Sequence, residues 1–350
     1  MMTPVAATPR VPALSVPPVT SVPPVTSAAA ATGLSPYGAG LLAALILIGM
    51  LVVIPWGLGL LDLDILDPLR RWWLLAAFPG AASFLVPRGP AAAALAGVYA
   101  AGTIALLVAL PEVTGRAPVR RPSAWTTRPA TTRQATIRQA TAATRLAAWS
   151  APVRAAMASA LVAPVIASSA LVAARGGYPL FGFSPTVLTL TVAHFHYAGF
   201  AAALIAALVC RALPGDPRAG AAAWSVPAGT LVVLAGFFLS DWVELAGAAI
   251  LTAGLWLAAW LTWTRIRPRG ERLTRWLMVI SCAVLPVSMA LALSWAVGRA
   301  AGLPHLSVAW MIATHGVTNA LGFAVCALLA WRTLDRPALA TPTPATSTEA

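Results

Sequence analysis

Charged residues are scarce in this chain, and one kind is missing altogether. Only 9% of its 350 residues are charged, lysine is absent, and 59% are hydrophobic, with a mean hydropathy of +0.81. The surface of a soluble domain needs far more charge than this. The composition therefore predicts a polytopic membrane protein.

Cysteine is also rare, and familiar catalytic signatures are missing. Cys210, Cys282 and Cys326 fit neither a disulfide framework nor a close-spaced metal motif, and we interpret them as small buried hydrophobic residues. The chain has no phosphate-cradling glycine loop, no His-Glu-x-x-His and no nucleophile elbow. The sequence therefore gives no direct sign of an enzyme, and whether the protein is one stays open.

Acidic residues are few as well, so the formal net charge is +13. A basic chain can bind nucleic acid, but here the arginines stand in the loops between apolar segments. Their expected neighbours are the anionic headgroups of a lipid bilayer. We therefore predict a lipid partner and no nucleic acid.

Long apolar segments fill the middle of the chain. Residues 1–34 and 333–350 are rich in Pro, Ala, Thr and Ser, and we expect both tails to be disordered. The transmembrane domain covers 37–331 and is interrupted by a basic cytoplasmic loop at 111–153. Its apolar segments are 37–60, 72–86, 90–110, 155–174, 186–210, 222–240, 244–264, 276–298 and 306–331. The predicted fold is an all-α polytopic transmembrane helical bundle of about nine spans, in which the short segment 72–86, interrupted by Pro79, need not cross fully.

Arginine placement gives this bundle an orientation. With the N-terminus outside and the C-terminus inside, 19 of the 23 arginines lie in cytoplasmic segments. The four external ones are Arg10, Arg88, Arg175 and Arg299. This asymmetry is what the positive-inside rule expects of a multi-pass protein of the cell membrane.

Two histidine segments lie deep in predicted spans. His194 and His315 stand eight and nine residues from the external starts of their spans, so both are about 12–14 Å below the same face. His196 is about half a turn deeper. Ionisable groups at such depth usually mark a function. The shared depth predicts that the two segments meet in one place.

Helical spacing decides which of these groups can act together. Residues two apart point about 200° away from each other, so His194 and His196 cannot easily bind one metal ion. Tyr197 shares the face of His194, and Asn319 lies four residues after His315 on one face. A His–Asn pair orients an imidazole or binds a polar ligand. The alternative is that these histidines only hydrogen-bond backbone carbonyls and lock helices together.

An acidic pair stands at the external boundary between two spans. Asp241 and Glu244 are three residues apart, and the preceding span is short enough to let Glu244 dip into the bundle. A solvated hairpin turn is the simpler interpretation of the same pair, because the boundary is wet.

Residues 191–197, Thr-Val-Ala-His-Phe-His-Tyr, resemble a stretch of the haem–copper oxidase catalytic subunit. In that family two histidines on opposite faces of this helix ligate two haems, which implies such a role for His194 and His196. The family also requires a further haem ligand and three copper-ligating histidines, whereas only His305 and His315 remain here. This excludes full oxidase chemistry and leaves a single haem open.

A second resemblance covers about residues 40–332. The segments 194–200, His-Phe-His-Tyr-Ala-Gly-Phe, and 315–323, His-Gly-Val-Thr-Asn-Ala-Leu-Gly-Phe, resemble the YndJ-like family of bacterial multi-pass membrane proteins. The resemblance implies a helical membrane architecture and that the two histidine segments belong together. It assigns no catalytic residue.

Three functions follow as hypotheses. The first is a transporter-like or sensor-like protein that binds a small ligand, metal or proton, and its candidate ligand-binding residues are His194, His196, Tyr197, His315, Asn319 and Glu244. The candidate metal ligands are His194, His196 and His315. The second is a redox protein or enzyme with haem or a transition metal as its cofactor. The third is a scaffold whose histidines only pack.

Overall fold

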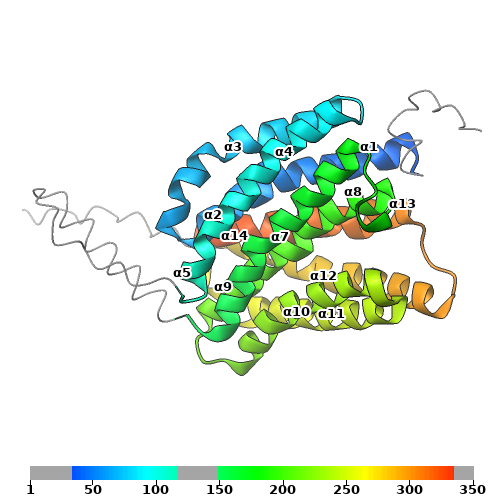
Figure 1. Cartoon of the computed structure of the whole chain (residues 1–350). Coiled ribbons are helices and arrows are strands. Elements are labelled where there is room, and N and C mark those ends of the chain that lie inside the picture. Colours follow the sequence, from blue (N-terminus) through cyan, green and yellow to red (C-terminus); the bar gives the residue numbers. More distant parts are fainter. Residues whose placement is uncertain (1–33, 117–148, 335–350) are drawn as a thin grey trace, which may run out of the picture.

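The computed structural model describes residues 34–116 and 149–334, and throughout this part the regular structure is helical (Figure 1). The two predicted disordered tails lie outside the described residues, except for Leu34, Thr333 and Leu334. Most of the predicted basic loop, residues 117–148, lies outside them too.

Eight helices of the described residues are long and apolar enough to cross a membrane. They are Pro36–Leu61, Pro90–Val113, Ala151–Gly176, Pro185–Ala212, Pro217–Leu239, Asp241–Arg269, Arg272–Ala301 and Val308–Leu334. Their α-helical parts are α1 (Pro36–Ile48), α2 (Ile54–Leu61), α4 (Pro90–Ala105), α5 (Leu110–Val113), α7 (Ala151–Gly176), α8 (Pro185–His194), α9 (Ala202–Ala212), α10 (Pro217–Leu239), α11 (Asp241–Leu261), α12 (Arg272–Ala301), α13 (Val308–Met311) and α14 (Cys326–Leu334). The chain is therefore a multi-span helical membrane protein.

The segment predicted as a ninth span, 72–86, falls in and just after α3 (Asp67–Ala82) and is not among these eight. The 16 residues of α3 extend about 24 Å, less than the hydrocarbon core, and Asp67, Arg70 and Arg71 lie in its first turns. The turn after it nevertheless touches the end of α7, because Arg175 Nη2 donates to Val86 O at 2.5 Å. Helix α3 therefore connects the two ends of the bundle although it is shorter than a membrane span.

Serine side chains begin several helices at one end of the bundle. A backbone N–H of the first turn donates to each of these hydroxyl oxygens, so one of the otherwise unpaired N–H groups at each helix start has a partner. The capping residues are Ser35, Ser184, Ser240 and Ser307. Helices α1, α8, α11 and α13 therefore have defined starts, which fixes the depth of every residue that follows.

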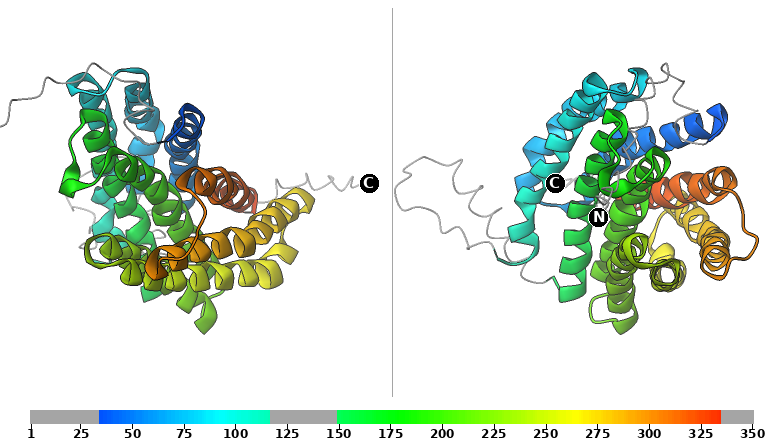
Figure 2. Two further views of the ribbon diagram at one scale, coloured as in Figure 1. Left: turned by 90° about the vertical axis from the view of Figure 1, so that its right-hand side faces the viewer. Right: turned by 45° about the vertical axis from the view of Figure 1, so that its right-hand side comes forward.

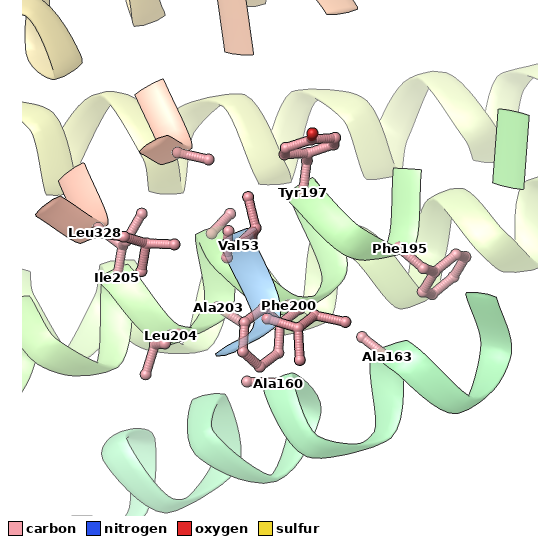
Figure 3. Close-up of a cluster of buried hydrophobic side chains, with 14 of the residues drawn as sticks. Val53, Ala160, Ala163, Phe195, Tyr197, Phe200, Ala203, Leu204, Ile205 and Leu328 are labelled. Atoms are coloured by element: carbon pink, nitrogen blue, oxygen red, sulfur yellow. The ribbon is translucent and has the colours of Figure 1, made fainter. Parts of the chain in front are cut away.

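The span Pro185–Ala212, here called the central helix, is the most enclosed. The most apolar window of this span is 83% buried, against 28–56% for the others. Figure 3 shows Phe200 and Leu204 of this helix gathered with Val53, Ala160 and Leu328 from three other spans. Figure 2 shows α10, α11 and α12 side by side at one flank of the bundle, and α3 and α4 at the opposite flank. The first histidine segment therefore sits on the innermost helix.

Wide helical turns meet at the centre of the bundle. Gly49–Val53, Phe195–Ala201 and Thr318–Val325 are π-helical, and the three segments contact one another. Side chains from other helices bind carbonyls near the first of them: Tyr197 Oη donates to Leu45 O at 2.7 Å and Trp73 Nε1 to Met50 O at 2.8 Å. Such π turns are rare and often occur at functional sites. Here they coincide with both histidine segments.

Candidate functional site

A cavity of about 880 Å³, here called the His194 cavity, lies between the central helix, α10–α12 and the last span. Most of its wall is apolar. Its ionisable and amide side chains are His194, Tyr197, Glu244, Arg299, His315 and Asn319. Five of the six residues predicted to bind a ligand thus line one space, and His196 does not.

The two histidine segments reach this cavity from helices that start at the same end of the bundle (Figure 1). His194 is the tenth residue of α8, and His315 is the eighth residue of the span that begins with α13. At 1.5 Å per residue both lie about 10–14 Å from those starts. Both rings line the same cavity. The structure therefore brings the two segments together at similar depth.

His194 has a ring nitrogen without a partner. Its Nε2 is buried and makes no hydrogen bond within residues 34–116 and 149–334. Leaving such a polar group unpaired costs roughly 1–3 kcal/mol. Nearly all buried polar groups in proteins have a partner, so an exception calls for a specific explanation. A polar ligand at this nitrogen provides one.

His315 is held by its neighbours in a single orientation. Its Nδ1–H donates to Ser288 O at 2.8 Å, which leaves Nε2 as the acceptor of a neutral ring. The Asn319 amide nitrogen lies 3.1 Å from Nδ1 and 3.2 Å from Nε2, so it rests over the face of the ring, and Ser288 Oγ donates to Asn319 Oδ1 at 2.9 Å. The predicted His–Asn pair therefore exists, and α12 fixes both of its members.

His196 faces away from the cavity, as the 200° separation requires. Its Nδ1–H donates to Val192 O at 2.5 Å, and Tyr99 Oη donates to its Nε2 at 2.6 Å. The ring is fully buried, and both nitrogens are used. This geometry fits the alternative hypothesis that a buried histidine only locks helices together. His196 does not face the cavity that His194 lines.

Gly49 gives the His196 ring its space. A Cβ at Gly49 would lie 2.9 Å from His196 Cβ, whereas one at Gly40, on the same span, would meet nothing within 4 Å. We expect Gly49→Ala to lower the free energy of unfolding by about 1–3 kcal/mol through overpacking. Gly40→Ala should change it by less than about 1 kcal/mol. Thermal unfolding of the two purified variants measures the difference, and equal midpoints would contradict this packing.

The acidic pair divides between two environments. Asp241 binds Arg299 in an exposed ion pair, while Glu244 is only 7% exposed and lines the cavity. Gly236 allows this, because a Cβ there would lie 2.4 Å from Glu244 N and force α10 and α11 apart. The predicted inward position of Glu244 is therefore observed, and the boundary position suits Asp241.

Tyr197 lines the cavity, but its hydroxyl is already used by Leu45 O. Within the described parts of the chain, no group of three or more His, Cys, Asp or Glu side chains is arranged to hold a metal ion. The three histidines predicted as metal ligands are not assembled, because His196 points to Tyr99. Apart from the His315–Asn319 pair, the polar groups of the cavity do not form a metal-binding cluster among the described residues.

Several residues of the site carried no usable sequence signal. Arg299 stood out only as an external arginine, and Ser288 and Trp295 looked like ordinary residues of an apolar span. An aromatic cluster also lines the cavity, in which rings pair edge to face at 5.3–6.1 Å. Its members are Phe181, Phe183, Phe237 and Phe238. Phe181 and Phe183 lie in the connection before α8 and Phe237 and Phe238 at the end of α10, so this contact could not be predicted from a single span.

Comparison with known proteins gives one match. A family model described as YndJ-like protein matches residues 44–323, which include both histidine segments. No curated protein and no solved structure matches the chain. Nothing in these comparisons supports the resemblance to the haem–copper oxidase subunit.

Proposed function

This chain belongs to the YndJ-like family, and we propose that it is a membrane protein that binds a small amphiphilic molecule in the His194 cavity. The volume of about 880 Å³ lies within the range of about 300–1,000 Å³ usual for ligand sites. An apolar wall with a few polar groups also matches the usual lining of such sites. The bound molecule would place its apolar part against this wall.

The observation that carries the proposal is the unpaired Nε2 of His194 beside the oriented His315–Asn319 pair. The polar end of the bound molecule would form a hydrogen bond with His194 Nε2 and contact the His315–Asn319 pair. Because Ser288 and Asn319 already hold His315, little ordering would be needed on binding. The π-helical segments around both histidines favour a transporter-like or sensor-like protein, since such turns can rearrange.

The experiment is native mass spectrometry of the protein purified from its own membrane in a mild detergent. We expect a bound molecule of a few hundred daltons that survives removal of bulk lipid. His194→Ala and His315→Ala should each reduce its occupancy while the protein stays folded. Wild-type protein that carries no such molecule, and whose thermal stability no amphiphile raises, would contradict the proposal.

We also propose that the protein lies in the cell membrane with the Arg88 end outside. Most arginines of the described residues gather at the opposite end of the bundle, where they would meet anionic headgroups. Several stack on tryptophan rings there, as Arg211 does on Trp149 and Arg267 on Trp263. Such rings favour the headgroup region of a bilayer.

Cysteine labelling tests this orientation. Leu303, 54% exposed between α12 and α13, and Glu271, exposed at the start of α12, lie at opposite ends. In a background without the three native cysteines, Leu303→Cys should react with an impermeant maleimide in intact cells. Glu271→Cys should react only after the membrane is opened. The reverse pattern would invert the orientation.

A further inference from the structure

The charged groups around the His194 cavity do not balance. Among the described residues, Glu244 and Arg299 are the only Asp, Glu, Lys or Arg residues in its wall. Asp241 binds Arg299 from outside the wall, and the Arg299 guanidinium also lies 5.1 Å from the centre of the Trp295 ring. Two acidic groups thus share one arginine, which leaves one negative charge over.

That charge belongs to Glu244. Among the described residues, none forms a hydrogen bond or an ion pair of less than 4.0 Å with its carboxylate, and the residue is only 7% exposed; its oxygens are not among the fully enclosed unpaired atoms and keep some access to the cavity. A carboxylate out of water is unfavourable unless a positive charge or hydrogen-bond donors compensate it. Arg299 lies near enough to act on it but is engaged by Asp241. A cationic ligand would supply this compensation and hold the Glu244 carboxylate in its ionised form.

The rest of the wall suits the body of such a ligand. The cluster of four phenylalanines lines the same cavity as Glu244, whereas the Trp295 ring already faces the Arg299 guanidinium. The face of an aromatic ring attracts a cation, and the attraction grows when both are removed from water. An anionic ligand would find Arg299 already paired and would meet Glu244 at close range.

We propose that the molecule bound in the His194 cavity is a lipophilic cation, with its positive charge against the Glu244 carboxylate and its apolar groups against the aromatic wall. This inference rests on the proposed function, because it specifies the ligand of the same cavity. It assigns Glu244 as the residue that determines charge selectivity.

The test uses two probes of nearly equal size and opposite charge, tetraphenylphosphonium and tetraphenylborate. Equilibrium dialysis against the purified full-length chain in a non-ionic detergent measures both affinities. We expect wild-type protein to bind the phosphonium at least about tenfold more tightly than the borate. Glu244→Gln should remove most of this preference. Glu271→Gln, which neutralises an exposed acidic residue at the other end of the bundle, should keep it.

Two further variants guard against misfolding. Glu244→Asp keeps the negative charge, so it should keep the preference for the phosphonium. Asp241→Asn frees Arg299 to pair with Glu244, so it should reduce that preference. Equal binding of both probes, tighter binding of the borate, or binding of neither by wild-type protein would overturn the lipophilic cation. A molecule that still copurifies with the wild-type chain would leave the proposed function standing, so the two failures are distinguishable.

Discussion

Replacing Ala248 by tryptophan is expected to prevent binding of the molecule proposed for the His194 cavity. Ala248 lines the cavity from α11, one turn after Glu244, so an indole there would occupy the space between the wall and the histidines. We expect the bound molecule to disappear from the native mass spectrum, with a loss of affinity of about 100-fold or more. That loss corresponds to roughly 2.7 kcal/mol of binding free energy.

The neighbouring residue supplies the control. Ala249 is on the same helix but is exposed on the outside of the bundle, so Ala249→Trp adds the same indole toward lipid. Its ligand occupancy and thermal midpoint should stay close to those of the wild type. If Ala248→Trp and Ala249→Trp retain the ligand equally, the binding site lies elsewhere.

The two histidines of the first segment are expected to differ sharply in their effect on stability. His196→Ala removes a fully buried ring, leaves the Tyr99 hydroxyl without its acceptor and opens a cavity against Gly49. We expect it to lower the free energy of unfolding by about 2–4 kcal/mol. His194→Ala removes a ring whose Nε2 has no partner to lose, and we expect less than about 1 kcal/mol.

Chemical denaturation of the two variants in matched detergent measures this contrast. Tyr99→Phe isolates the hydrogen bond from the packing, and it should cost about 1 kcal/mol because only one hydroxyl is lost. Ligand occupancy should follow the opposite order, with His194→Ala losing the bound molecule and the Tyr99 variant retaining it. Equal destabilisation by the His194 and His196 variants would mean that the two rings share one role.

Relations within a single helix could be predicted from the sequence. The divergence of His194 from His196 and the pairing of His315 with Asn319 were expected from 3.6 residues per turn. Both are observed although His196, His315 and Asn319 lie in π-helical turns. The common depth of His194 and His315 follows from counting residues from the helix starts. The number of spans was harder to predict, because α3 joins both ends of the bundle but is shorter than the length needed to cross a bilayer.

Relations between helices needed the tertiary structure. The sequence does not identify Tyr99 as the hydrogen-bond partner of His196, because 97 residues separate them and a tyrosine in an apolar span usually only packs. The same holds for Ser288 on His315 and for Arg299 between Asp241 and Glu244. Periodicity reports which residues share a face of one helix, but not which other helix that face will meet.

Composition and helical patterns were enough to predict a bundle of membrane-spanning helices with histidines in two of them. They were enough because apolar length, arginine placement and helical period are local properties of the chain. The packing of the helices was needed to learn that His194 lines a cavity while His196 is held in the core. That difference depends on contacts with Tyr99, Gly49 and α12, which form when distant helices pack.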